Sequence, residues 1–142
     1  MTGTFFLSFP PGWCAAAAAL GVGWGGSLQV NGINTQGENI ADNGGLKQAY
    51  RAFNRLEQRL GVEPRLPGLQ EYNSKQMFWI AAGNTWCGAY RKEALKMRVL
   101  TARHSPAQFR VNGPVSNMPD FARDFNCKAG AKMNPVHRCS VW

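Results

Sequence analysis

The chain has 142 residues, a hydrophobic fraction of 44% and five Trp, which is enough apolar material for one folded domain and excludes an intrinsically disordered chain. Its net charge is +8, but the basic residues are spread from Lys47 to Arg138. The densest cluster, at 91–103, carries no nucleic-acid recognition motif. We therefore interpret the charge as a solvated face and expect no nucleic-acid partner; a basic nucleic-acid binder is the weakest alternative.

The first 37 residues contain no charged side chain. Their apolar runs are interrupted by proline and glycine, and none approaches the roughly 20 apolar residues of a membrane span. The segment also lacks the basic start of a secretory signal, although the alanines at 15–19 could serve as a small-residue cleavage zone. The sequence thus contains no convincing signal or transmembrane segment.

The most informative stretch begins at Glu38, the first charged residue, with Asp42 four residues later. This spacing places both carboxylates on one face of a helix. The same face continues as an apolar stripe at helical period, formed by Leu46, Ala49, Phe53, Leu56 and Leu60. We predict a helix over 36–60, ended by Gly61 and Pro64, with the two acids on its buried side.

Two carboxylates at this spacing repel each other and are costly to bury without a cation beside them. The basic residues of the same helix, Lys47, Arg51, Arg55 and Arg59, lie on a different face and do not neutralise the acids. A metal ion would answer this need, with one acid as ligand and the other orienting a neighbouring ligand.

A capping box is the simpler interpretation of the same residues. Thr35 would be the N-cap, Glu38 would bond back to its backbone N–H, and Asp42 would lie near the positive end of the helix dipole. Spacing alone favours this cap, because capping boxes are far commoner than metal sites. The adjacent Gly44 and Gly45 argue the other way, since two glycines in a helix cost about 2 kcal/mol and suggest the close approach of a backbone or ligand.

Further helices are expected downstream. Asn73 or Ser74 caps a buried helix over 75–91, Ser105 and Pro106 begin another, and a short helix covers 119–125. Without a strand pattern, the chain is expected to be mainly α. His104 then lies on a loop and Arg110 in the first turns of the next helix. From spacing alone, His104 is most simply an ordinary surface histidine.

Residues 31–52 contain the run Gly37-Glu38-Asn39-Ile40-Ala41-Asp42, which resembles the third-ligand segment of the neprilysin and endothelin-converting-enzyme family of zinc metalloendopeptidases. The resemblance continues through Trp86-Cys87, His104-Ser105-Pro106, Phe109-Arg110, Met133-Asn134-Pro135 and 139–142. It implies that 28–142 form the C-terminal helical portion of a thermolysin-like zinc metallopeptidase catalytic domain, which is incomplete here. Residues 1–27 do not match, and we expect them to reflect a truncated or mis-joined reading frame.

The resemblance also implies a role for four residues. Glu38 would be the third ligand of one Zn²⁺ ion, and Asp42 would orient a ligand histidine and belong to the catalytic set. His104 would hydrogen-bond the tetrahedral oxyanion, and Arg110 would bind a backbone carbonyl of the peptide substrate.

The chain departs from the family in lacking a His-Glu-x-x-His motif, because its only histidines are His104 and His137. Two zinc ligands and the general base are therefore expected in a missing N-terminal half of the catalytic domain. We expect a fragment of an enzyme that hydrolyses peptide bonds in oligopeptides, with neither tight zinc binding nor activity on its own. The alternative is a catalytically inactive peptide-binding or pseudo-enzyme module.

The four cysteines form no C-x-x-C pair, and from the residues alone they are buried free thiols. The resemblance instead implies an extracellular, disulfide-bonded protein, either secreted or anchored on the outer side of the plasma membrane. It matches Cys87, Cys127 and Cys139, and it implies a Cys14–Cys139 bridge. Separation from the rest of the domain would expose apolar surface, so we expect marginal stability.

Overall fold

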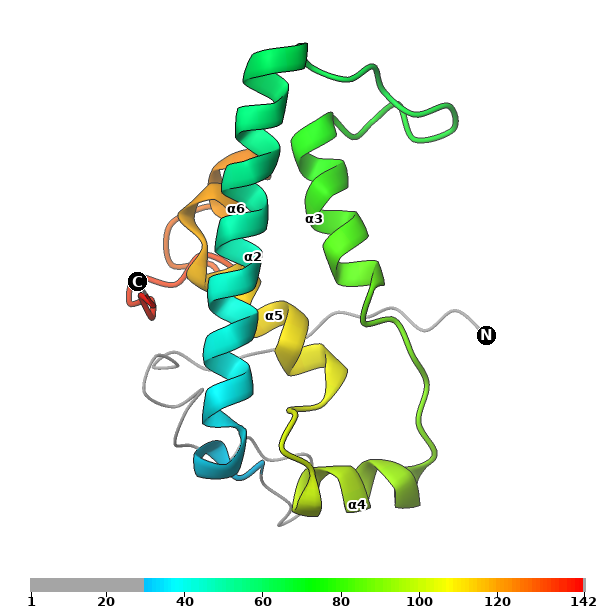
Figure 1. Cartoon of the computed structure of the whole chain (residues 1–142), viewed down its shortest axis with the longest axis vertical. Coiled ribbons are helices and arrows are strands. Elements are labelled where there is room, and N and C mark those ends of the chain that lie inside the picture. Colours follow the sequence, from blue (N-terminus) through cyan, green and yellow to red (C-terminus); the bar gives the residue numbers. More distant parts are fainter. Residues whose placement is uncertain (1–29, 142) are drawn as a thin grey trace.

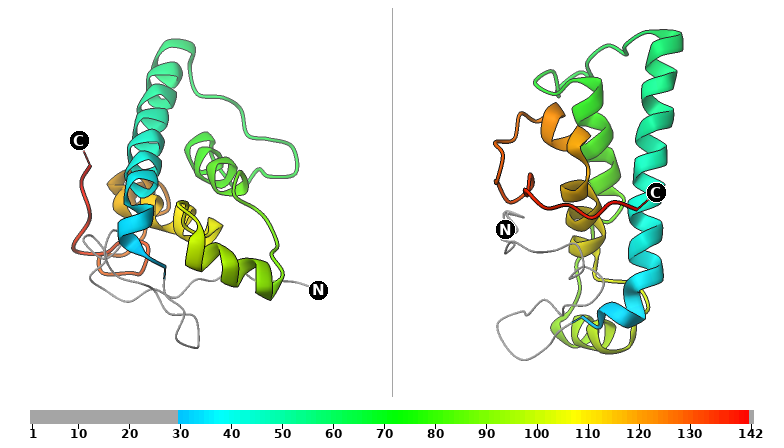
Figure 2. Two further views of the ribbon diagram at one scale, coloured as in Figure 1. Left: turned by 60° about the horizontal axis from the view of Figure 1, so that its bottom comes forward. Right: turned by 90° about the vertical axis from the view of Figure 1, so that its left-hand side faces the viewer.

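The computed structural model describes residues 30–141, which form five helices, the longest of which is α2 (Figure 1). Their bounds are α2 (Gly32–Leu60), α3 (Ser74–Asn84), α4 (Lys92–Thr101), α5 (Ala107–Asn117) and α6 (Pro119–Asp124). No strand occurs within 30–141, which confirms the mainly α prediction. Helices α3, α5 and α6 pack together beside α2, whereas α4 lies across the end of the molecule at which α2 begins (Figures 1 and 2).

Helix α2 begins four residues before the predicted start. The N-cap is Asn31, whose Oδ1 accepts hydrogen bonds from the backbone N–H groups of Ile33 and Asn34 at 3.0 and 3.2 Å. The capping-box interpretation is therefore wrong. Thr35 lies inside the helix with only 2% of its surface exposed, and its hydroxyl donates to the carbonyl of Asn31. An amide cap upstream satisfies the first N–H groups, so Thr35 and Glu38 remain available for other contacts.

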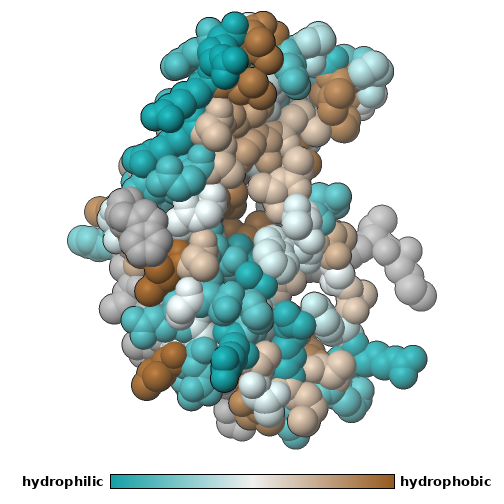
Figure 3. Space-filling model, in the orientation of Figure 1, coloured by the Kyte–Doolittle hydropathy of each residue, from teal (hydrophilic) through white to brown (hydrophobic). Residues whose placement is uncertain are grey.

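The predicted end of α2 is confirmed, but its apolar stripe is only partly buried. Gly61 follows the helix at φ +87°, and its N–H donates to the carbonyl of Glu57. Leu46 and Phe53 pack in the core, whereas Leu56 and Leu60 are 44% and 74% exposed. Helix α2 extends past the elements that cover it, and Figure 3 shows the resulting apolar surface along the inner sides of α2 and α3.

The helix predicted over 75–91 is shorter in the structure, because residues 85–91 are not helical. Helix α3 begins with a capping box of Asn73 and Gln76, as the sequence suggests, but ends at Asn84. A second helix, α4, which the sequence did not predict, begins at Lys92. The chain leaves α3 because Trp86 turns toward α5, a tertiary contact that local helix propensity does not encode.

Helix α5 is capped differently from the prediction. Its N-cap is Pro106 rather than Ser105, and no side chain caps it. Ser105 is only 3% exposed and donates from Oγ to Oδ1 of Asn39 on α2 at 2.8 Å. The hydroxyl is therefore used to join two segments. The short last helix, α6, agrees with the predicted 119–125 to within one residue.

The core is aromatic and surrounds one buried carboxylate. Tyr50 of α2 and Trp79 of α3 stack with ring centroids 4.5 Å apart, beside Val115 and Met118. Asp124 of α6, whose side chain is 5% exposed, accepts hydrogen bonds from the Tyr50 hydroxyl and from Nε1 of Trp79, the latter at 2.8 Å. This carboxylate connects three helices, because each polar edge of the stacked pair is bonded to it.

A second polar contact closes the other end of the fold. Glu57 is 9% exposed and accepts a hydrogen bond from Ser74, so the first residue of α3 is bound to the last turns of α2. The C-terminal segment returns across α2, where Lys47 lies 3.4 Å from the carbonyl of Val141 (Figure 2). Within the described part of the chain, no helix has the length and apolar character needed to cross a membrane.

Candidate functional site

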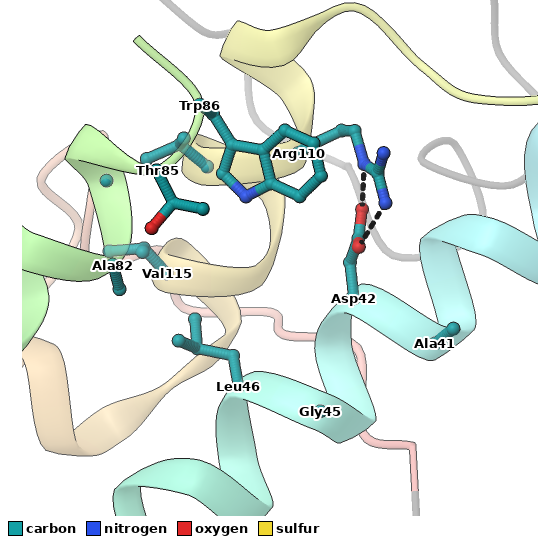
Figure 4. Close-up of a pocket in the computed structure, with 11 residues that line it drawn as sticks. Ala41, Asp42, Gly45, Leu46, Ala82, Thr85, Trp86, Arg110 and Val115 are labelled. Carbon is teal, nitrogen blue, oxygen red and sulfur yellow. Dashed lines mark hydrogen bonds and ion pairs between the residues drawn. The ribbon is translucent and has the colours of Figure 1, made fainter.

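Asp42 and Arg110 form the most buried ion pair of the described chain. Asp42 projects from α2 toward the first turns of α5, where Arg110 donates from Nε and one terminal nitrogen to the two carboxylate oxygens, both at 2.7 Å (Figure 4). The side chains are 13% and 11% exposed. The hydrogen bonds to Asp42 raise the pKa of Arg110. This fork geometry fixes the guanidinium plane more firmly than a single contact would.

The indole ring of Trp86 stacks against the guanidinium of Arg110. The central carbon of the Arg110 guanidinium lies 3.8 Å from the centroid of the indole, well within cation–π range (Figure 4). Asp42, Trp86 and Arg110 line a pocket of about 260 Å³ between α2, α3 and α5. The sequence marked Trp86 only as an apolar helix residue and a family position, and it gave no signal for the stacking.

Glu38 and His104 form a second, more exposed contact. Nε2 of His104 lies 2.9 Å from Oε2 of Glu38, and the side chains are 45% and 41% exposed. The carboxylate is therefore accessible, and one of its oxygens has no bond to a residue of 30–141. Both contacts join α2 to the segment 104–110, and they follow each other by one helical turn along α2.

The position of His104 is set by its neighbour. Ser105 bonds to Asn39, and Asn39 also donates from its amide to the Thr35 hydroxyl at 3.1 Å. Asn39 follows Glu38 directly on α2. The buried Ser105–Asn39 bond therefore fixes the histidine loop against the turn of α2 that carries Glu38.

We expect Asn39→Ala to lower the free energy of unfolding by about 1–3 kcal/mol, because it leaves the buried Ser105 hydroxyl without its acceptor. Urea unfolding monitored by circular dichroism measures the change. Asn34→Ala, the same substitution at an exposed position of α2, should change stability by no more than about 0.5 kcal/mol. Equal losses in the two variants would contradict a supporting role for Asn39.

The structure shows which residues lie beside the acids Glu38 and Asp42 of α2. The prediction that the basic residues of α2 do not neutralise them is confirmed, since among the described residues Glu38 contacts the His104 imidazole and Asp42 pairs with Arg110. Arg110 supplies the cation beside Asp42 from a position 68 residues away. Within 30–141, no group of three or more His, Cys, Asp or Glu side chains is arranged to hold a metal ion.

The glycines and cysteines give a mixed result. A Cβ added at Gly45 would meet nothing within 4 Å, so the expected close approach is absent there, while Gly44 is buried. Cys87 and Cys127 form no disulfide within 30–141, and the burial predicted from the residues alone is wrong, because Cys87 is exposed and Cys127 is half-buried. Cys14 lies outside the described residues, so its bridge to Cys139 stays a prediction, as does the origin of residues 1–27.

Comparison with known proteins shows which family the chain resembles. The model of the family described as peptidase family M13 matches residues 5–141. Neprilysin-2 of Drosophila melanogaster is 61% identical over 115 residues, and an endothelin-converting enzyme homolog of Locusta migratoria is 50% identical over 113 residues. These matches cover 81% and 80% of this chain, but 15% of each relative.

A solved structure shows the same fold. The zinc metalloprotease Zmp1 of Mycobacterium tuberculosis, in its open state, superimposes with a TM-score of 0.75 at 27% identity, over 91% of this chain and 20% of that protein. The fold is thus that of the helical C-terminal portion of a metallopeptidase catalytic domain. The chain belongs to peptidase family M13. It spans less than one fifth of the length of the curated relatives that it matches.

Proposed function

We propose that this chain supplies one side of the active site of a zinc-dependent metalloendopeptidase that hydrolyses oligopeptides. The observation that carries the proposal is the pairing of Glu38 with His104 and of Asp42 with Arg110. These four residues lie together where α2 meets the segment 104–110. The remaining zinc ligands and the general base would come from the part of the family's catalytic domain that the chain does not span. Membership of family M13 supports the reaction class.

Of the two carboxylates of α2 at this site, only one is well placed to bind a metal ion. Glu38 is the candidate, because its carboxylate is 41% exposed and only one oxygen is bonded to a described residue. Asp42 is the weaker candidate, because each of its oxygens already accepts a hydrogen bond from Arg110 and its side chain is only 13% exposed. A bound zinc ion would supply Lewis acidity toward the peptide carbonyl. One carboxylate does not make a tight zinc site, so the chain alone should not retain the metal.

The other residues act on the peptide. His104 lies beside Glu38 and would exchange its contact with the carboxylate for the carbonyl oxygen that gains charge during attack, donating from its imidazole N–H. Arg110 uses Nε and one terminal nitrogen for Asp42 and keeps the other terminal nitrogen for a substrate carbonyl. Asp42 and Trp86 hold the guanidinium so that little side-chain freedom is lost on binding.

A chimera tests the proposal. We would replace the 115 matched residues of Drosophila neprilysin-2 by the corresponding residues of this chain and measure bound zinc and cleavage of a quenched-fluorescent peptide. We expect about one zinc per chain and chelator-sensitive cleavage. Glu38→Gln should remove both zinc and activity, whereas Glu63→Gln, an exposed control in the loop after α2, should remove neither.

The isolated chain distinguishes the alternative. We expect no chelator-sensitive cleavage by the 142 residues alone, with weak peptide binding that Arg110→Gln reduces. The inactive peptide-binding module of the second hypothesis would give the same binding, but the chimera would then remain inactive. Zinc retention and activity in the Glu38→Gln chimera would overturn the ligand assignment.

A further inference from the structure

Helix α4 and its flanks carry a concentrated positive charge that the site described above does not use. The segment 91–103 contains five basic residues and one acid, Glu93. Its net charge of +4 is half the +8 of the whole chain. The basic residues are Arg91, Lys92, Lys96, Arg98 and Arg103, which we call the α4 patch.

The charges of the α4 patch are not neutralised within the described chain. No ion pair within 30–141 involves Arg91, Lys92, Lys96 or Arg103, and all four side chains are exposed. Two of them stand at the start of α4, where the helix dipole is already positive; Glu93 is the one acid in this first turn, and no side chain caps this end. Such a placement is unfavourable for the helix itself, and an anionic partner would relieve it.

The patch lies next to the candidate site. Helix α4 ends at Thr101, three residues before His104, and it crosses the end of the molecule at which α2 begins (Figures 1 and 2). Glu38 lies in the second turn of α2. Between the cations, Met97 and Leu100 are 59% and 51% exposed. The surface therefore offers apolar contact as well as charge to a chain that extends from the site.

We propose that the α4 patch is a specificity surface that selects peptides with acidic side chains outside the residues held by His104 and Arg110. The inference rests on the proposed peptide-binding function and names the substrate class of that site. Carboxylates of the peptide meet exposed ammonium and guanidinium groups, while Met97 and Leu100 contact its apolar parts. The patch acts mainly by raising the rate of encounter and by rejecting basic peptides.

Two fluorescein-labelled peptides test the proposal on the full 142-residue chain. They share one sequence, except that one carries Glu where the other carries Gln at positions flanking a common apolar centre. Fluorescence anisotropy at about 0.05 M salt should show about 5- to 10-fold tighter binding of the acidic peptide. At about 1 M salt, where exposed charges are screened beyond roughly 3 Å, the preference should disappear.

A matched pair of variants locates the effect. The double substitution Lys92→Glu with Lys96→Glu should abolish the preference. Arg55→Glu with Arg59→Glu makes the same change in charge, at the same four-residue spacing, on exposed positions near the far end of α2, and should retain it. Equal loss in both double variants would show an effect of net charge alone and would overturn the proposal.

The remaining outcomes distinguish the specificity surface from the proposed function and from nucleic-acid binding. Equal binding of the two peptides would remove the specificity surface and leave the proposed function standing. Binding of neither peptide would remove both the surface and the peptide-binding function. A duplex DNA probe that binds more tightly than the acidic peptide, and loses binding in the Lys92/Lys96 variant, would assign the patch to nucleic acid instead.

Discussion

Asp42→Ala should lower the free energy of unfolding by about 3–5 kcal/mol, which is a large part of the stability of a chain of this size. The substitution leaves the guanidinium of Arg110, whose side chain is only 11% exposed, without either of its two bonds to the carboxylate. A buried charge that loses its partner costs far more than the pair contributes. Urea unfolding followed by far-ultraviolet circular dichroism measures the loss.

The chain provides its own control. Asp120 and Arg123 are also 2.7 Å apart, but their side chains are 35% and 59% exposed. Asp120→Ala should therefore cost no more than about 1 kcal/mol, because water replaces the lost partner. Combining Asp42→Ala with Arg110→Leu should recover part of the loss, since both members of the pair are then removed. Equal costs at Asp42 and Asp120 would show that burial does not set the strength of this contact.

The sequence predicts α2 well because its signals are local. The apolar period runs along the helix, and Gly61 ends it at a positive φ. The start was misplaced because Thr35 and Glu38 form a good capping box in sequence, while Asn31 performs the capping in the structure. Thr35 instead lies one turn inside the helix, where its hydroxyl donates to the Asn31 carbonyl and accepts from the Asn39 amide.

Helix α4 and the end of α3 were missed for a different reason. The segment 92–101 alternates basic and apolar residues with almost no single apolar face, so periodicity gives little signal. The end of α3 depends on Trp86, which leaves the helix to stack on Arg110 of α5. A boundary set by a contact with a later helix cannot be deduced from the earlier helix alone.

For the site, the residues could be named but their pairing could not. Spacing predicted that the two acids of α2 need a nearby cation, and the family resemblance named His104 and Arg110. Neither indicated that Arg110 itself, 68 residues beyond Asp42, is that cation. Asn39 and Ser105 were likewise missed, because their bond appears only when α2 and the 104–110 segment are side by side. The residue types indicated the chemistry of the site, whereas the partner that neutralises Asp42 could be identified only from the fold.

The second large effect is a loss of stability in alkali that depends on Tyr50. Burial and then the hydrogen bond to Asp124 raise the pKa of Tyr50 to about 12. The unfolded chain releases the same proton near pH 10. Between these values the folded state holds one more proton than the unfolded state, so the free energy of unfolding falls as the pH rises. We expect this contribution to be complete below about pH 10 and to decrease by about 3 kcal/mol up to pH 12.

Urea unfolding at intervals across this range measures the decrease, and Tyr50→Phe isolates it. The phenylalanine variant has no phenol to titrate at this position, so its stability should be lower below pH 10 and should approach that of the unsubstituted chain toward pH 12. Tyr72→Phe removes a phenol from the turn before α3 and should leave the alkaline decrease in place. If Tyr50→Phe loses stability in parallel with the unsubstituted chain from pH 10 to 12, other groups titrate there and the Tyr50–Asp124 bond does not govern alkaline unfolding. Spectrophotometric titration of the phenols in the folded chain gives an independent reading, because ionisation of Tyr50 in the folded state should be centred near pH 12.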